Sequence, residues 1–315
     1  MKRTRSPGFL GISALAVATA ITLVTSAASA QASALPLEQE ASAFLNSTFA
    51  WNYGASPPGA NGQCTPSAGH PYPVVLVEAT FFSMYNAFGA ISPDLANNGY
   101  CVYAFNYGQT IPLTGIYATA DIATDASQLS KEVNRVLAET GASKVDLVGW
   151  SQGGMMPRYY ISKLGGAAKV HMLVALAPSN YGTSLDGLVN LITKLGLLGV
   201  ATALLSATCP ACVQQIHGSS FLTRLNHTPT AARVKYVVIE TKHDEVITPY
   251  TNAFLPAGPN VQNITLQDQC RQDASDHLSI GYDSNALQDI VNALGKDNPK
   301  FRPSCAAVSP LIGNV

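Results

Sequence analysis

The sequence predicts an α/β fold, in which helices cover both faces of a mostly parallel central sheet. Short apolar runs of strand length recur along the chain, and segments with the apolar spacing of a helix alternate with them. This alternation is typical of parallel sheets. Hydrophobic residues make up 47% of the 315 residues and charged residues only 12%. A chain with so little charge is expected to bury a large core.

Six apolar runs have the length of strands buried on both faces of a sheet. They span residues 73–77, 101–105, 144–148, 170–177, 234–240 and 261–266. Three helices are expected at residues 121–141, 154–164 and 285–294. The first of them carries its apolar residues on one face and ends at Gly141. Ligands of such sheets bind beyond the carboxyl ends of the strands, so we expect the functional residues there.

The charge balance excludes several classes of protein. The chain has 18 Lys and Arg against 19 Asp and Glu, a formal net charge of −1, with no basic run outside the first five residues. A charge-driven nucleic-acid binder is therefore excluded. Global disorder is excluded by the high hydrophobic content. A transmembrane bundle is excluded because only one stretch approaches membrane length.

Residues 1–30 have the pattern of a secretory signal peptide. A basic start is followed by an apolar stretch at 9–24 and by Ala28-Ser29-Ala30, small residues that suit cleavage. A membrane anchor is the alternative, but polar and glycine residues interrupt the apolar stretch. We therefore expect a secreted, extracellular protein in which residues 31–315 form one domain.

The six cysteines suit an oxidising compartment, where an even number suggests three disulfides. The sequence alone leaves 15 pairings open. Cys209 and Cys212 form a C-x-x-C motif that could be a redox pair or half of a zinc site. No second C-x-x-C motif exists, so a static short-loop disulfide is favoured and no metal is expected.

A strongly apolar segment at 185–205 lies between two expected strands. Its leucines recur at helical spacings, and the C-x-x-C motif follows it. The segment could be an ordinary pair of core helices. We favour a helical cap or lid over about residues 183–223, in which 185–205 lines an acyl pocket or contacts a lipid–water interface.

The strongest chemical signal is Gly149-Trp150-Ser151-Gln152-Gly153, directly after an expected strand and before an expected helix. This is the G-x-S-x-G nucleophile elbow, a tight turn that exposes a serine hydroxyl. Side chains at 149 and 153 would collide in such a turn, so both positions are glycine. A structural serine in a glycine turn is the alternative interpretation.

A serine hydroxyl needs a base and an orienting carboxylate, which follow it in the chain order Ser, acid, His. Asp244 lies just beyond the expected strand 234–240, and His277 follows the strand 261–266. The other histidines lie before the acid, inside a strand, in the cap region or beside Asp244. Glu245 and Asp268 are rivals for the acid, and Asp276 is expected to shape the loop.

The tetrahedral oxyanion of acyl transfer also needs hydrogen-bond donors. One is expected to be the backbone N–H of Gln152, the residue after the nucleophile. The second is expected from the loop after the strand 73–77, where Thr80 fits best and its hydroxyl could add a further hydrogen bond.

Several stretches of the chain resemble one known family. They are residues 56–61, 73–77, 97–103, 144–160, 177–180, 210–215 and 244–250. They are similar to the secreted class 2 lipases of actinobacteria, α/β-hydrolases of the same broad group as lipase B of Candida antarctica. The resemblance runs from about residue 56 to residue 294, most of the chain beyond the signal segment.

The resemblance implies an α/β-hydrolase fold and a role for each matching residue. It implies Ser151 as nucleophile, Asp244 as acid, His277 as base, and Thr80 and Gln152 as oxyanion donors. It implies no metal or organic cofactor. The disulfides that it implies are Cys64–Cys101, Cys209–Cys212 and Cys270–Cys305.

Two departures from the family pattern bear on activity. The family usually has His-Gly before the oxyanion threonine, where this chain has Glu78-Ala79. Alanine lacks the backbone freedom of glycine, so we expect a different loop and a hole that is not preformed. Glu78 would also oppose a developing anion unless it is protonated or turned away. Trp150 stands where relatives often have His, and we expect it to reshape the alcohol side of the pocket.

The sequence therefore predicts a secreted serine carboxylic ester hydrolase, a triacylglycerol lipase that forms an acyl-enzyme on Ser151. Its substrate would be an acylglycerol or another ester, and a monomer without a nucleic-acid partner is expected. The alternatives are a short-chain esterase, polyesterase or acyltransferase on the same scaffold. A non-catalytic protein that binds lipid or cell wall is a further alternative, for which the altered loop at Glu78 is the warning sign.

Overall fold

The computed structural model describes residues 1–2, 33–37, 52–112, 114–184, 186–187, 189–190, 209–295, 298 and 300–311. The chain divides into two units, Met1–Ser33 and Ala34–Val315, and every element below belongs to the second. The expected signal segment lies almost wholly outside the described residues. So does most of the apolar segment 185–205.

Six strands form one parallel sheet in the order β2-β1-β3-β4-β5-β6. They are β1 (Val74–Val77), β2 (Val102–Ala104), β3 (Val145–Trp150), β4 (Val170–Leu176), β5 (Lys235–Glu240) and β6 (Val261–Thr265). Every residue of β1 and β3 is buried, because helices cover both faces of the sheet. The mostly parallel sheet and all six strand positions confirm the sequence prediction.

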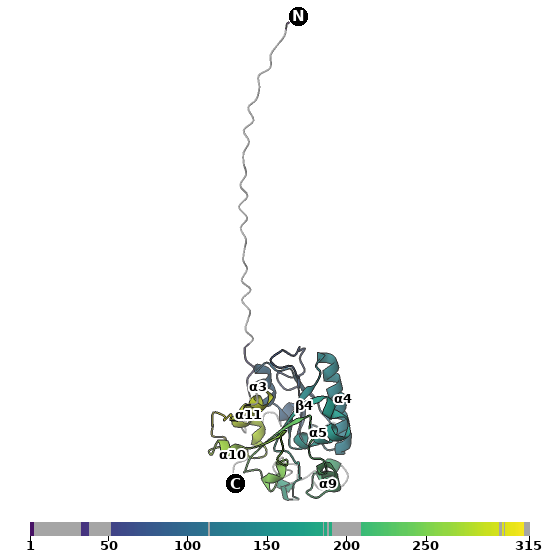
Figure 1. The fold of residues 1–315 in the computed structure, drawn as a ribbon, viewed down its shortest axis with the longest axis vertical. Helices are drawn as coiled ribbons and strands as arrows, with labels where there is room; N and C mark the ends of the chain where they lie inside the picture. Colours follow the sequence, from purple (N-terminus) through teal and green to yellow (C-terminus); the bar gives the residue numbers. More distant parts are fainter. Residues whose placement is uncertain are drawn as a thin grey trace. The chain divides into compact units, whose positions relative to one another are not determined.

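The long helices lie on two sides of the sheet. They are α3 (Ile91–Asn97), α4 (Ile122–Thr140), α5 (Gln152–Lys163) and α11 (Ser284–Leu294). α4 and α5 pack together against β3, whereas α3 and α11 pack together on the opposite side (Figure 1). α4 begins at Asp121, whose carboxylate accepts from two amides of the first turn, and ends at Gly141 in a left-handed conformation (φ 69°). The three helices expected from sequence are confirmed.

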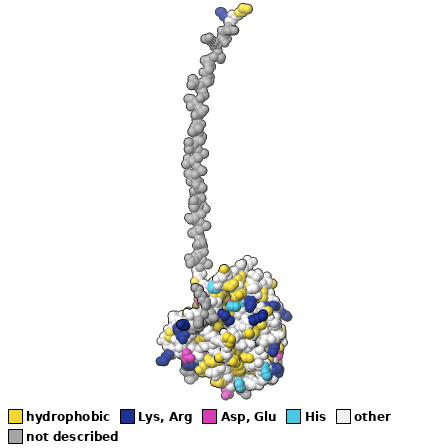
Figure 2. Space-filling model, viewed as in Figure 1, with side chains coloured by type: hydrophobic (Ala, Val, Ile, Leu, Met, Phe, Trp, Pro, Cys, Tyr) yellow, Lys and Arg dark blue, Asp and Glu magenta, His cyan; other side chains and the backbone are white. Residues whose placement is uncertain are grey.

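Shorter elements complete the fold. They are α2 (Met84–Ala87), α8 (Pro210–Gln214), α9 (Ser220–Asn226), α10 (Leu266–Gln269), and the 3₁₀ turns η1 (Gly166–Ala168), η3 (Tyr250–Ala253) and η4 (Ser279–Tyr282). No helix in the described ranges is long and apolar enough to cross a membrane. Uncharged side chains dominate the face shown in Figure 2, in keeping with the 12% of charged residues.

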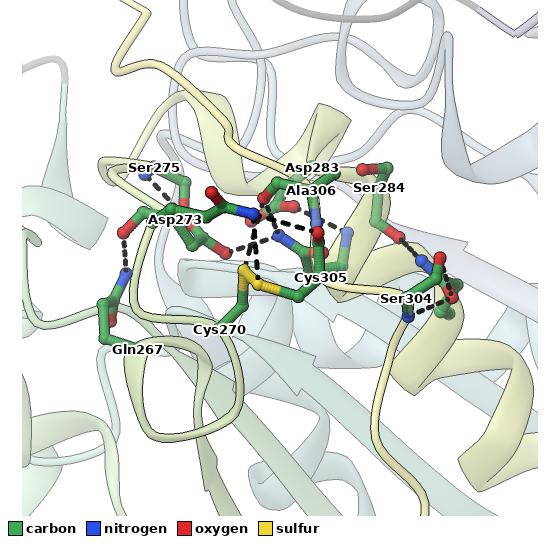
Figure 3. The surroundings of a disulfide bond; sticks show 12 residues. Gln267, Cys270, Asp273, Ser275, Asp283, Ser284, Ser304, Cys305 and Ala306 are labelled. Atoms are coloured by element: carbon green, nitrogen blue, oxygen red, sulfur yellow. Dashed lines mark hydrogen bonds between the residues drawn. A yellow bond between two sulfur atoms is a disulfide. The ribbon is translucent and has the colours of Figure 1, made fainter.

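The structure contains three disulfides, the same pairs that the family resemblance implies. They are Cys64–Cys101, Cys209–Cys212 and Cys270–Cys305. Because Cys209 and Cys212 are bonded to each other, neither a dithiol nor a zinc site is present at this motif. Cys270–Cys305 ties the C-terminal segment to the loop that leads to His277 (Figure 3). Asn285 holds the same segment through two hydrogen bonds with the backbone of Ala306.

A buried pair of carboxyl groups lies beside this disulfide (Figure 3). Asp283 accepts from the backbone N–H of Asn285 (2.7 Å), and Asp273 accepts from Ser275 and from the Asn285 side chain. Burial, together with the charge of Asp273 and a hydrogen bond with it, raises the pKa of Asp283 to about 8. The protonated form of Asp283 is therefore favoured at neutral pH, with a proton that it can share with Asp273.

Asp283→Asn is expected to flatten the pH dependence of stability. A raised folded pKa stabilises the protein below the unfolded pKa, and this stabilisation is lost as pH rises toward about 8. An asparagine amide supplies the shared proton at every pH. Between pH 6 and pH 9, the free energy of unfolding should fall by roughly 1–3 kcal/mol more in wild type than in the variant. Urea unfolding without reductant measures this difference. Parallel pH curves for the two proteins would contradict the shared proton.

Candidate active site

The turn between β3 and α5 has the strained geometry of a nucleophile elbow. Ser151 has φ 55° and ψ −118°, a conformation that residues other than glycine rarely adopt. A Cβ on Gly149 would lie 1.8 Å from the carbonyl oxygen of Gly153, and one on Gly153 would lie 1.9 Å from the carbonyl oxygen of Val77. Both glycines are therefore required by close backbone approach, as the sequence predicts.

This elbow lies at the switch point of the sheet. The chain runs from β1 to β2 on one side and then returns to β3 on the other side of β1. Val77 pairs with Gly149 at the carboxyl end of these two strands. The loop Glu78–Thr80 and Ser151 therefore leave the sheet side by side, at the place where parallel sheets bind ligands.

Three side chains from distant parts of the chain meet at this edge. The Nε2 atom of His277 lies 3.1 Å from the Oγ atom of Ser151. The Nδ1 atom of His277 lies 2.7 Å from the Oδ2 atom of Asp244. All three residues are buried. The imidazole is thus within hydrogen-bond reach of both partners and can take a proton from the serine hydroxyl while the carboxylate orients it.

The Asp244 carboxylate is fixed by its own loop. Its Oδ1 atom accepts from the backbone N–H groups of Val246 (2.8 Å) and Ile247 (2.6 Å), which leaves Oδ2 directed at the imidazole. The rival acids make other contacts. Glu245 accepts from the backbone N–H of His277, and Asp268 pairs with the surface residue Lys242.

The charge on His277 is set by two opposing effects. Burial alone lowers the pKa of His277 because it disfavours the charged imidazolium. The charge of Asp244 and its hydrogen bond outweigh burial, with further contributions from Glu245 and Asp276, and the pKa of His277 is raised above its usual value. Asp276 also accepts from the backbone N–H groups of Leu278 and Ser279, which shapes the loop as the sequence predicts.

Trp150, the residue before the candidate nucleophile, lies in the core. Its ring is completely buried and packs against Phe82 and Tyr282. The Nε1–H group donates to the backbone carbonyl of His277 (3.1 Å). Trp150 therefore supports the histidine loop from inside the core. The expectation that it reshapes the alcohol side of the pocket stays a prediction.

The oxyanion loop contacts the elbow through a side chain. The Thr80 hydroxyl donates to the side-chain oxygen of Gln152 (2.8 Å). A further hydrogen bond from this hydroxyl to an oxyanion stays a prediction. Within the described part of the chain, the backbone N–H groups of Thr80 and Gln152 donate no hydrogen bond. These two amides remain the candidate oxyanion donors.

Glu78 and Ala79 are accommodated without the expected conflict. Glu78 is completely buried, and its carboxyl accepts from the backbone N–H of Tyr107 (3.0 Å). Burial raises the pKa of Glu78 well above its usual value, with the charge of Asp125 adding to the effect. Burial thus favours the neutral form of this carboxyl, which lies in the core against the backbone of Tyr107. The positive φ of this loop falls at Phe81 (73°), so Ala79 has no need of glycine's freedom.

Two residues near the elbow were not identified from sequence. Asp125 of α4 accepts from the Gln152 side chain (3.1 Å), and burial raises the pKa of Asp125 to about 7. Gln215 donates to both Thr80 and Gln152. Gln215 lies in the stretch 210–215 that resembles the family, but the sequence assigns neither residue a role, because each acts through a contact with a segment at least 27 positions away.

A serine on a strand–turn–helix elbow, with a histidine and an aspartate supplied after later strands, defines the α/β-hydrolase class. A family model for class 2 lipases matches residues 71–289, and the chain belongs to this family. The family membership confirms the resemblance seen in the sequence.

Individual relatives agree with this assignment. The chain is 30% identical over 145 residues to a triacylglycerol lipase of Pseudarthrobacter phenanthrenivorans, covering 43% of this chain and 42% of the relative. It is also 30% identical over 145 residues to a triacylglycerol lipase of Burkholderia plantarii, covering 43% and 37%. Each match thus spans less than half of the relative.

Solved structures of similar fold include two lipases. Lipase B of Aspergillus fumigatus superposes with a TM-score of 0.59 at 20% identity, covering 79% of this chain and 56% of that chain. The mature lipase BlEst2 of Bacillus licheniformis superposes with a TM-score of 0.54 at 15% identity, covering 75% and 96%. At these identities the likeness supports the fold alone.

Asp244→Asn is expected to change both the level and the pH profile of ester hydrolysis. A general base must be neutral, so kcat/KM should rise with pH through a pKa above the usual 6.5 or so of histidine. Without the carboxylate, burial dominates, and the rise of kcat/KM on the acidic side (the acidic limb) should move to lower pH. The maximal kcat/KM at higher pH (the plateau) should fall about 10⁴-fold, as for the equivalent change in a serine protease.

The matched control is Asp268→Asn, which removes a surface carboxylate that is paired with Lys242. It should leave both the plateau and the acidic limb unchanged. An unshifted acidic limb in Asp244→Asn would show that Asp244 does not set the pKa of His277.

Proposed function

We propose that the chain is a secreted serine carboxylic ester hydrolase that acts as a triacylglycerol lipase. The proposal is carried by one observation, the continuous contact from Ser151 through His277 to Asp244. Membership of the class 2 lipases and the activities named for the two partial relatives support the choice of an ester substrate.

The reaction would follow the acyl-enzyme route. The Ser151 oxygen attacks the ester carbonyl carbon and its proton passes to Nε2 of His277, while the amides of Thr80 and Gln152 receive the oxyanion. The imidazolium then gives this proton to the leaving alcohol as the C–O bond breaks. Water attacks the acyl-enzyme with the imidazole again as base, which releases the fatty acid and restores the serine.

Secretion is part of the same proposal. Three disulfides favour an oxidising compartment, and residues 1–30 have the pattern of a cleaved signal. The mature enzyme would comprise residues 31–315 with a cap at about 183–223. Mass spectrometry of the exported protein should find Gln31 at its N-terminus; an intact residue 1–30 segment would contradict cleavage.

The substrate class can be tested with a series of acylglycerols and p-nitrophenyl esters of increasing acyl length. Wild type should release acid from long-chain esters at least as fast as from short-chain ones, and Ser151→Ala should release none above background. A strong preference for the shortest esters would indicate the esterase alternative. Complete inactivity of wild type on every ester would contradict the proposed function.

A further inference from the structure

Gln215 connects the two loops that carry the candidate oxyanion donors. It follows α8 as its C-cap residue and is buried, with 5% of its surface exposed. Its Nε2 atom lies 3.0 Å from the Oγ1 atom of Thr80 and 2.8 Å from the Oε1 atom of Gln152. One side chain thus contacts both the loop after β1 and the start of α5.

The neighbours of Gln215 allow only one orientation of its amide. Ser179 donates its hydroxyl proton to the Oε1 atom of Gln215 (2.7 Å). On the other side, Asp125 accepts from the Nε2 atom of Gln152 and so turns Oε1 of Gln152 toward Gln215. Rotating the Gln215 amide would place its oxygen against the Oε1 acceptor of Gln152 and its nitrogen against the hydroxyl proton of Ser179. The N–H groups of Gln215 must therefore face Thr80 and Gln152.

The side chains of the network are buried, so bulk water does not compete for these contacts. Thr80, Gln152 and Gln215 form a closed triangle, since Thr80 also donates to the Oε1 atom of Gln152. Buried polar networks of this kind hold their members in a single arrangement when every member is satisfied. The backbone amides of Thr80 and Gln152 have no hydrogen bond among the described residues to hold them. Their side chains supply a direct hydrogen-bonded link between the two loops that carry these amides.

We propose that Gln215 is a positioning residue for the oxyanion hole. It sets the spacing between the amides of Thr80 and Gln152 and does not touch the substrate. The inference rests on the proposed function, because it concerns the transition state of ester hydrolysis. It also gives the region after the apolar segment a role in catalysis: α8 delivers this side chain into the site.

The same helix provides a matched control. Gln214, the preceding residue, accepts from the backbone N–H of Ile122 and donates to Asp121 (2.6 Å), which anchors α8 to the start of α4. Gln214→Leu and Gln215→Leu each remove one glutamine amide from the end of α8. Only the second change removes a contact with the oxyanion loops.

The test compares wild type, Gln215→Leu and Gln214→Leu by ester kinetics and by inhibition with an alkyl boronic acid. The boronate forms a tetrahedral anion on the serine and reports on the oxyanion hole. In Gln215→Leu, kcat should fall about 10–100-fold with KM within about threefold, less than the roughly 10²–10³-fold lost with a donor itself. Boronate affinity should fall by a similar factor. Gln214→Leu should stay within about threefold of wild type in all three quantities.

Two outcomes would overturn the inference: unchanged kcat and boronate affinity in Gln215→Leu, or equal losses in Gln214→Leu. Should Gln215→Leu not fold, Thr80→Val breaks the same triangle at nearly constant volume, whereas Thr80→Ser keeps the hydroxyl. The valine variant should then show the loss and the serine variant should not; equal behaviour would overturn the inference. Failure of the proposed function is distinguishable, because wild type itself would then hydrolyse no ester.

Discussion

Replacing His277 with alanine is expected to lower kcat/KM for ester substrates by about 10⁵–10⁶-fold, as for the equivalent histidine in a well-studied serine protease. The reason is geometric. His277 is the group within hydrogen-bond reach of both the Ser151 hydroxyl (3.1 Å) and the Asp244 carboxylate (2.7 Å). Without the imidazole the serine keeps its proton at neutral pH and is a poor nucleophile.

His243→Ala is the control for this loss. His243 adjoins the candidate acid in sequence, but its side chain is exposed. This variant should keep activity within about twofold of wild type. Circular dichroism should show that both variants remain folded. If His277→Ala kept more than a small percentage of wild-type kcat/KM, another base would have to act in the site.

Gly153→Ala is expected to be among the most damaging small changes to the fold. Its new Cβ would lie 1.9 Å from the carbonyl oxygen of Val77 and 2.6 Å from that of Glu78. Both obstacles are backbone, at the end of a central strand, so neither can move without distorting the sheet. A destabilisation above about 4 kcal/mol, among the largest for single substitutions, is expected in urea or thermal unfolding.

Gly62→Ala is the matched control, because its Cβ would meet no atom within 4 Å. Its stability should stay within about 0.5 kcal/mol of wild type, as for most surface substitutions. Equal stability of the two alanine variants would mean that the elbow is less closely packed against β1 than the structure has it.

The sequence predicted the sheet and its long helices because their signals are local. Continuous apolar runs such as Val74–Val77 indicate strands buried on both faces, and the cap residues Asp121 and Gly141 mark the ends of α4. The short helices α2, α8 and α10 have four or five residues each, too few for a periodic pattern to appear.

The positions of the three candidate catalytic residues were also predictable, since each follows the carboxyl end of a strand in a known chain order. The contacts that hold these residues in place were not predictable. The indole of Trp150 is in contact with the carbonyl of His277, 127 positions away. Gln215 reaches Thr80 across 135 positions. Contacts of this kind depend on how loops meet after folding, and no local pattern of residues encodes them.

The environment of Glu78 was likewise not predictable from the sequence. The residue type alone suggested a negative charge that would oppose the developing oxyanion. Only the structure reveals that its carboxyl is buried against the backbone of Tyr107, where burial raises the pKa of Glu78 and favours the neutral form. The departure from the family pattern at Glu78-Ala79 is therefore compatible with an ester hydrolase.

Labelling with a fluorophosphonate, followed by mass spectrometry of the peptides, tests the activated serine most directly. This reagent reacts with serines that a neighbouring base has activated. We expect one adduct per molecule on the peptide containing residue 151, none in Ser151→Ala, and strongly slowed labelling in His277→Ala. An adduct on any other residue, or equal labelling of wild type and Ser151→Ala, would contradict the account.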